Sequence, residues 1–379
     1  MLLRNVRILD FTDAKGMLCG KLLADMGAEV IIIDKPGSSS PQSYAAAGKR
    51  SITLDITKPA GQGLFKQLAA VSDILIESFS PGTLDKAGIG YQDCSKINPE
   101  LIFCSITLFG QNGPYHNYQA SELVAGSLGG SVYVNGDPDK EPLKLPGAQS
   151  YNTAGLYAAN AVMLALWKRN NTGKGSFIDV SVQECTASTL DHILVRQKAL
   201  EEKAVRRGGL YWNNAFQVFR CKDGYALLTL LQQWDTLVEW LDSEGMAADL
   251  KDDRWSNDEF RQKNIDHITA VIGEWTIKHS VDELVETGQL MRFPWARISS
   301  PADVLSDEQL TARGYFETVE GEAAGRKYIF PGAPVKMSGA VWTAKTEFAQ
   351  PGEANEEIYI NLLGMSEQEF SELRSGGVI

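Results

Sequence analysis

Residues 22–37 read LLADMGAEVIIIDKPG, and this stretch decides the fold class. Its first part continues a helical spacing of apolar side chains that begins at Met17, and Gly27 ends that pattern. The residues from Val30 to Ile33 are then apolar without interruption. A strand that is apolar on both faces is typical of a parallel sheet covered by helices on both sides. The stretch therefore predicts a helix followed by a buried parallel strand.

The same alternation extends in both directions along the chain. Further strands are predicted at residues 6–11, 51–54, 73–77, 101–106 and 177–182, and helices at residues 58–70 and 150–169. Strands separated by helices indicate a doubly wound, Rossmann-like α/β layer. From residue 191 the pattern changes to charged helices with short strands such as residues 225–230, and the helices carry Trp234, Trp240, Trp255 and Trp275. This change predicts a second, smaller α+β unit.

Composition excludes several classes of function. The chain has 379 residues and a formal net charge of −12, which repels a phosphate backbone, so we expect no nucleic-acid partner. No run approaches the roughly 18 apolar residues of a membrane span, and charges interrupt the N-terminal stretch MLLRNVRILDF. We therefore expect a soluble, cytoplasmic protein without a membrane partner. The five cysteines are scattered and form no C-x-x-C pair, which favours reduced, buried thiols.

The absence of several motifs argues against NAD binding, hydrolase chemistry and zinc chemistry. No G-x-G-x-x-G follows the first strand, so the Rossmann-like layer does not indicate NAD. The chain has no G-x-S-x-G elbow, no H-E-x-x-H and only four histidines, which argues against a hydrolase triad and against zinc. The sequence predicts no metal site and no tightly bound cofactor.

A series of segments identifies a family resemblance. The segments are VRILDFT (6–12), LLADMGAEVIIIDKPG (22–37), KRSITLDITKPAGQ (49–62), DILIESFSPGTLDKAGIGY (73–91), NPELIFCSITLFGQNGPY (98–115), LWKRNNTGKGSFIDVSVQE (166–184) and GAPVKMSG (332–339). Together, in this order, they resemble the class III CoA-transferase family of the CaiB/BaiF type. The resemblance implies a large Rossmann-like CoA-binding domain formed by residues 1–190 and 310–379 and a small domain at 215–300. It also implies linkers at 191–214 and 301–309, and two subunits interlocked as a dimer.

The expected ligand is CoA or an acyl-CoA, bound as substrate. Its phosphates need cations near strand ends, and five cations fall after strands or in adjoining loops: Lys15, Lys35, Lys49, Arg50 and Lys86. By resemblance, the CoA contacts are Ala14, Lys15, Lys35, Leu54, Ser78, Phe79 and Lys86, with Leu54 and Phe79 at the adenine. Each lysine can equally be an ordinary solvated charge and Phe79 a core aromatic. Thr57 departs from a Lys found in some members of the family.

The chemistry is where the chain departs from the resemblance. Transferases of this family use an Asp that attacks the acyl-CoA, and its position here falls on Tyr151, or on Ser150 in a racemase-like alignment. No Asp or Glu lies between Glu141 and Asp179. The racemases of the family need a His and an Asp, whose places are taken by Ser121 and Ser150. Glu122 is the nearby carboxylate that could stand in, although a polar residue that caps the following helix is the simpler interpretation. The glycine loop of the transferases has a candidate in Gly208-Gly209.

Three hypotheses follow. The first is a subunit of a heteromeric CoA-transferase that lacks its own catalytic Asp, pairs with an Asp-bearing paralogue and is active only within that hetero-oligomer. The benzylsuccinate CoA-transferase type, with two unlike members of the family, is the precedent. The second is a self-sufficient homodimer that performs acyl-CoA transfer, isomerisation or lyase chemistry with a group such as Glu122. The third is a CoA-binding protein without turnover.

Overall fold

Two compact units make up the chain in the computed structural model, which describes residues 1–39, 43–201, 203–206, 210–211, 216–320, 327–339, 342, 345 and 347–379. Unit 1 comprises Met1–Tyr133, Leu143–Ala204 and Gln309–Ile379. Unit 2 comprises Val134–Pro142 and Val205–Glu308. The chain therefore leaves unit 1 twice and returns to it twice.

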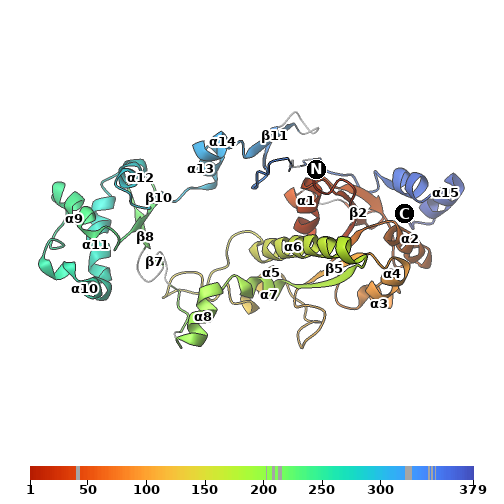
Figure 1. Cartoon of the computed structure of the whole chain (residues 1–379), viewed down its shortest axis with the longest axis horizontal. Helices are drawn as coiled ribbons and strands as arrows, with labels where there is room; N and C mark the ends of the chain where they lie inside the picture. The colour runs from red at the N-terminus through yellow and green to blue at the C-terminus, as the bar shows by residue number, and fades with distance from the viewer. Residues whose placement is uncertain are drawn as a thin grey trace. The chain divides into compact units, whose positions relative to one another are not determined.

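Unit 1 is built on a sheet of six parallel strands in the order β3-β2-β1-β4-β5-β6 (Figure 1). The strands are β1 (Arg7–Phe11), β2 (Glu29–Asp34), β3 (Arg50–Thr53), β4 (Ile74–Glu77), β5 (Ile102–Thr107) and β6 (Ser176–Ser181). The register pairs Leu9 of β1 with Ile31 of β2 and with Leu75 of β4. The strand order reverses between β1 and β4, so this pair is the topological switch point. The predicted α/β class with a Rossmann-like layer is confirmed.

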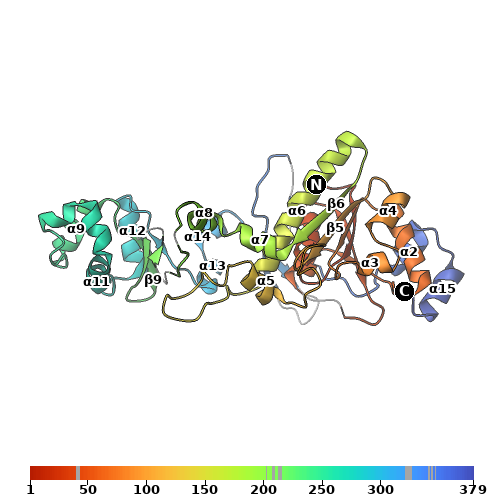
Figure 2. The same ribbon diagram turned by 90° about the horizontal axis from the view of Figure 1, so that it is seen from below.

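Helices cover both faces of this sheet (Figure 2). One face is covered by α1 (Met17–Asp25), α5 (Glu122–Leu128), α6 (Gln149–Thr172) and α7 (Val182–Ser188). The other face is covered by α2 (Pro59–Ala70), α3 (Thr83–Lys86), α4 (Tyr91–Ile97), α15 (Glu367–Ser375) and the π-helix Glu356–Leu362. The remaining elements of unit 1 are the 3-10 helix Tyr44–Ala46, α8 (Asp191–Ala199), α14 (Glu308–Ala312) and the hairpin of β11 (Phe316–Glu320) and β12 (Lys327–Pro331).

The C-terminal part of the chain secures the edge strand β3. The amide of Thr53 donates to Asn355 Oδ1 at 2.9 Å, and Tyr359 donates its hydroxyl to the Thr53 carbonyl at 2.8 Å. Tyr359 is fully buried, so this hydrogen bond lies inside the core. Residues from both ends of the chain thus form one layer.

Unit 2 packs helices against a small sheet of order β10-β9-β8-β7, in which each neighbouring pair is antiparallel. Its strands are β7 (Leu210–Tyr211), β8 (Phe216–Arg220), β9 (Tyr225–Thr229) and β10 (Ala296–Arg297). Its helices are α9 (Trp234–Ser243), the 3-10 helix Asp253–Ser256, α10 (Asp258–Lys263), α11 (Ile265–Thr276), α12 (Val281–Leu290) and α13 (Pro301–Leu305). The exposed Glu244 accepts a hydrogen bond from each indole of Trp240 and Trp275 at 2.8 Å.

The structure also bears on the expectations about the cysteines and about membrane-spanning segments. All five cysteines are buried and free, as the sequence predicts. Within the described residues, no helix is long and apolar enough to cross a membrane.

Candidate functional site

The parallel strands β3, β2, β1 and β4 end at the same edge of the sheet, which we call the carboxyl edge. The segments that follow these strands carry the residues predicted to contact CoA: Ala14 and Lys15 after β1, Lys35 after β2, Leu54 after β3, and Ser78, Phe79 and then Lys86 after β4. Open α/β sheets bind ligands beyond the carboxyl ends of their strands, at the switch point. The structure therefore brings these residues to the edge where the topology favours a ligand.

Ser78 joins the two segments that flank the switch point. The Asp13 amide donates to Ser78 Oγ at 2.8 Å, and Ser78 Oγ donates to Asp13 Oδ1 at 3.0 Å. Asp13 also forms an ion pair with Lys15. Lys35 and Lys86 are exposed, and neither has an ion-pair partner within the described parts of the chain. Two unpaired cations therefore remain at this edge.

The two residues expected at the adenine differ in exposure. Phe79 is half-buried and meets the ring of Phe11 edge to face, with ring centroids 4.7 Å apart. Leu54 is only 1% exposed and belongs to the core beside the same rings. Phe79 thus has surface to offer a ligand, whereas the Leu54 side chain offers almost none.

Two of the five cations predicted near the phosphates, Lys49 and Arg50, form ion pairs with other parts of the chain. Lys49 is buried and pairs with Asp10 at 2.7 Å, and Arg50 pairs with Glu29 at 3.1 Å. Both therefore already have an ion-pair partner within the chain, which corrects their grouping with the cations available to phosphate. Thr57 lies in the turn after β3, where its hydroxyl and amide both donate to Asp55.

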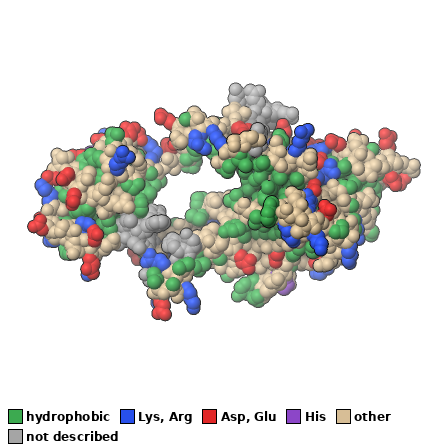
Figure 3. Space-filling view, in the orientation of Figure 1, with side chains coloured by type: hydrophobic (Ala, Val, Ile, Leu, Met, Phe, Trp, Pro, Cys, Tyr) green, Lys and Arg blue, Asp and Glu red, His purple; other side chains and the backbone are tan. Residues whose placement is uncertain are grey.

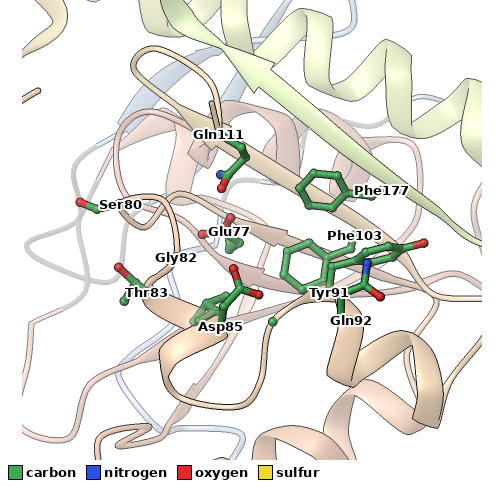
Figure 4. A pocket seen from close by; sticks show the side chains of 12 residues that line it. Glu77, Ser80, Gly82, Thr83, Asp85, Tyr91, Gln92, Phe103, Gln111 and Phe177 are labelled. Atoms are coloured by element: carbon green, nitrogen blue, oxygen red, sulfur yellow. The ribbon is translucent and has the colours of Figure 1, made fainter. Parts of the chain in front are cut away.

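A cavity of about 200 Å³ opens beside the carboxyl end of β4, and Phe103 and Phe177 near the starts of β5 and β6 also line it (Figure 4). Three rings, of Tyr91, Phe103 and Phe177, form one wall, with centroids 5.1 to 5.9 Å apart. The rest of the lining is mainly polar and includes the carboxylates of Glu77 and Asp85. Among the described residues, no Lys or Arg lines this cavity, so its chemistry differs from that of the cationic edge.

Glu77 is a residue that the sequence reasoning missed. It ends β4, is 5% exposed and accepts the Phe79 amide at 2.8 Å. Burial raises the pKa of its carboxyl to about 7, while hydrogen bonds from Ser105 and from the Phe79 amide act in the opposite direction. The sequence feature that could have indicated Glu77 is its position as a carboxylate at the end of an apolar strand, immediately before Ser78 and Phe79.

The positions expected to carry the catalytic Asp lie where α5 meets the start of α6, which we call the α5–α6 junction. Here the buried Ser150 donates its amide to Glu122 Oε1 at 3.1 Å, and Lys144 Nζ lies 3.1 Å from Glu122 Oε2. Ser121 is the N-cap residue of α5 and makes no side-chain capping bond. Glu122 does not cap α5 as the simpler interpretation expected, because its carboxylate binds the first turn of α6 instead.

Tyr151 is half-buried at this junction. Burial raises the pKa of its phenol, the negative charges of Asp13 and Glu122 raise it further, and a hydrogen bond with the Glu122 backbone acts in the opposite direction. The phenol is therefore neutral at physiological pH. The proximity of Asp13 also places Tyr151 near the β1 side of the carboxyl edge.

Two other predictions concern the wider site. Gly208-Gly209 lies outside the described residues. Within the described ranges, no group of three or more His, Cys, Asp or Glu side chains is arranged to hold a metal ion.

Comparison with known proteins now assigns the family. The model of CoA-transferase family III matches residues 3–353. The chain belongs to CoA-transferase family III. The resemblance stated from the sequence segments is confirmed.

Relatives of this family III chain are named for CoA transfer. It is 30% identical to succinyl-CoA:(R)-benzylsuccinate CoA-transferase subunit BbsE of Thauera aromatica, over 93% of this chain and 92% of that protein. It is 29% identical to the succinyl-CoA–L-malate CoA-transferase beta subunit of Chloroflexus aurantiacus, over 100% of this chain and 98% of that protein. A crystal structure of a CaiB/BaiF family protein from Brucella suis superposes with a TM-score of 0.84 at 28% identity, covering 94% of this chain and 98% of that one.

Proposed function

We propose that the chain is a subunit of a CoA-transferase that moves CoA between carboxylic acids, and that it works with an Asp-bearing paralogue because it lacks a catalytic Asp. The observation that carries this proposal is the α5–α6 junction. Neither Tyr151 nor Ser150 supplies a carboxylate, and Glu122 is engaged by the Ser150 amide and by Lys144. The two relatives named as subunits support the pairing.

The division of labour follows from the chemistry. In the transfer, an Asp oxygen of the paralogue attacks the thioester carbonyl and CoA leaves as a thiolate, which produces a mixed anhydride. The thiolate then attacks the aspartyl carbonyl, the donor acid leaves, and CoA is held as an aspartyl thioester. The acceptor acid reverses both steps and releases the Asp. The phenol of Tyr151 can accept an acyl group but cannot become a thioester, so it cannot hold CoA while the acids exchange.

CoA binding is the part of the reaction that this chain retains in our proposal. We place the phosphates at Lys15, Lys35 and Lys86, the adenine against Phe79 with Leu54 behind it, and further polar contacts at Ser78 and the Ala14 backbone. The common position of these residues at the carboxyl edge supports the assignment. The two unpaired lysines are available to a phosphate at little cost, because no ion pair has to break first.

We further propose a cytoplasmic assembly of two interlocked subunits, with residues 191–214 and 301–309 as the linkers between the domains. Unit 1 exposes large apolar side chains on α5, α6 and α8 and at the C-cap of α8: Leu123, Val124, Leu128, Leu156, Tyr157, Leu164, Trp167, Leu194, Val195 and Leu200. Green hydrophobic side chains also gather beside α1 and the start of α6 in Figure 3. An exposed apolar surface of this extent is typical of a protein interface.

A second candidate is a self-sufficient enzyme that uses Glu122. Its support is the position of Glu122 at the α5–α6 junction, next to Ser150 and Tyr151. The ion pair with Lys144 argues against it, since a nucleophilic carboxylate has to be free to attack.

The test is CoA transfer between a thioester and a free acid, measured for the chain alone and with its paralogue. We expect transfer only from the pair. Replacing the paralogue's Asp should abolish transfer, whereas Tyr151→Phe should leave it intact. Robust turnover by the chain alone that is lost in Glu122→Gln would contradict the proposal and support the second candidate. Calorimetry at low salt should detect CoA binding, and a failure of both chain and pair to bind would remove the proposed role.

A further inference from the structure

Helix α1 has a buried lysine–aspartate ion pair near each of its ends. Near its start, Lys49 Nζ lies 2.7 Å from Asp10 Oδ2, and the two side chains are 0% and 2% exposed. Near its end, Lys21 Nζ lies 2.7 Å from Asp25 Oδ1, and these side chains are 0% and 1% exposed. The two pairs are therefore matched in chemistry, distance and burial, and they differ in what they hold.

The first pair holds the β1–α1 turn, residues 12–16. Asp10 Oδ1 accepts the Thr12 amide at 3.1 Å and the Thr12 hydroxyl at 2.5 Å. Lys49 donates to the carbonyl of Met17, the first residue of α1, at 2.8 Å. The entry and the exit of the turn are thus both fastened to one buried ion pair.

The packing around this pair leaves little room for another arrangement. A Cβ atom at Gly20 would lie 2.1 Å from Asp10 Oδ2 and 3.0 Å from Lys49 Nζ. Within the turn, a Cβ atom at Gly16 would lie 2.6 Å from Cγ2 of Thr12. Glycine at these two positions lets α1 approach the pair and lets the turn close.

The second pair holds a different part of the chain. Lys21 donates to the Lys345 carbonyl, and the Lys345 amide donates to Asp25 Oδ1 at 2.9 Å. This pair therefore fastens α1 to the C-terminal segment. Its described hydrogen bonds do not involve the β1–α1 turn.

We propose that Lys49 and Asp10 are positioning residues that hold the β1–α1 turn in its CoA-binding form. The inference rests on the proposed function, in which Ala14 and Lys15 of this turn contact CoA. Loss of Lys49 would release the carbonyl of Met17, and loss of Asp10 would release Thr12. Binding would then have to order the turn, and the entropy of that ordering would be subtracted from the affinity.

The matched pairs supply the experiment. Lys49→Met and Lys21→Met should lower the thermal midpoint of unfolding by similar amounts, because each leaves a buried carboxylate without its partner. Calorimetry with CoA, on the full chain in its assembly, should show about tenfold weaker binding for Lys49→Met, the loss expected for roughly one charge-assisted contact. Lys21→Met should bind CoA as the wild type does. Equal affinities in the two variants and the wild type would overturn the inference.

Three further variants keep the test decisive if a single substitution prevents folding. The double replacements Asp10→Leu with Lys49→Met, and Lys21→Met with Asp25→Leu, remove both charges of one pair and restore apolar packing. Gly20→Ala leaves all four charges and presses on Asp10, so it should also weaken CoA binding. A wild-type assembly that does not bind CoA would overturn the proposed function and this inference together. A wild type that binds normally, with unchanged binding in the Asp10/Lys49 variants, would overturn the inference alone.

Discussion

The carboxyl edge and the α5–α6 junction belong to the same unit, but they differ in whether their charged side chains already have a partner. At the edge, Lys35 and Lys86 are exposed and have no ion pair within the described residues. At the junction, Glu122 is bound by the Ser150 amide and by Lys144. Unpaired charge can meet a ligand, whereas groups that already bind one another hold the fold. This difference is what the proposed function requires of a chain that binds CoA without a nucleophile of its own.

The largest expected effect concerns Glu77, beside the carboxyl edge. Burial raises the pKa of its carboxyl to about 7, from 4.5 for an exposed group, so the folded state binds the proton more tightly than the unfolded state. Glu77 therefore contributes stability below about pH 4.5 that is lost as the pH rises through about 7, and the loss is about 3 kcal/mol. Glu77→Gln should remove this pH dependence and be more stable than the wild type at pH 8. Parallel stability curves from pH 5 to 8 in urea unfolding would show that Glu77 does not titrate in this way.

The next effect tests the unpaired charge at the edge. Lys86→Ala should weaken CoA binding by about 1–2 kcal/mol, because a charge-assisted contact with a phosphate is lost, while the stability stays unchanged. Lys174 is the matched control, since it is an exposed lysine that precedes β6 at the opposite edge of the sheet. Calorimetry should find normal affinity in Lys174→Ala. Equal losses in both variants would mean that only the overall charge matters.

Glu122→Gln should show the reverse pattern. The loss of the ion pair with Lys144 should lower stability by about 1 kcal/mol, with CoA affinity unchanged. A double-mutant cycle with Lys144→Met isolates the pair, because the cycle subtracts the hydrogen bonds that Lys144 also donates to the carbonyls of Leu145 and Gly147. If Glu122→Gln instead folds normally and loses turnover, the junction is a site of chemistry and the comparison fails.

Tyr151→Phe should have the smallest effect. It removes one hydroxyl from a half-buried position, so we expect a loss of stability of about 0.5 kcal/mol and unchanged CoA binding. Thermal unfolding and calorimetry on the same preparation measure both. A marked fall in CoA affinity would assign the Tyr151 hydroxyl to the binding surface.

The parts that were predictable from the sequence are those governed by local patterns. The uninterrupted apolar run from Val30 to Ile33 indicates a strand covered on both faces, and β2 is such a strand. Residues that follow parallel strands reach one edge by topology alone, which is why Lys35 and Ser78 could be placed together.

The parts that could not be predicted depend on contacts between distant residues. Lys49 follows a loop, a position that suggested a cation available to a phosphate. Its ion-pair partner Asp10 is 39 residues away in the sequence, so the local pattern does not indicate the pair. The hydrogen bond between Ser150 and Glu122 spans 28 residues, and the sequence around neither residue indicates it. Residues 134–142 carry no pattern that indicates membership of unit 2, and their assignment comes only from the fold.

The anchoring of β3 by the C-terminal segment has a consequence for synthesis of the chain on the ribosome. Thr53 and its partner Asn355 are 302 residues apart, so at typical translation rates roughly 15–60 s pass between their appearances. During that interval the backbone of an edge strand lacks its final cover, and uncovered edges pair readily with other chains. The nascent protein is therefore expected to depend on chaperone protection until residue 359 has emerged, and a premature stop before Asn355 should yield an aggregation-prone product.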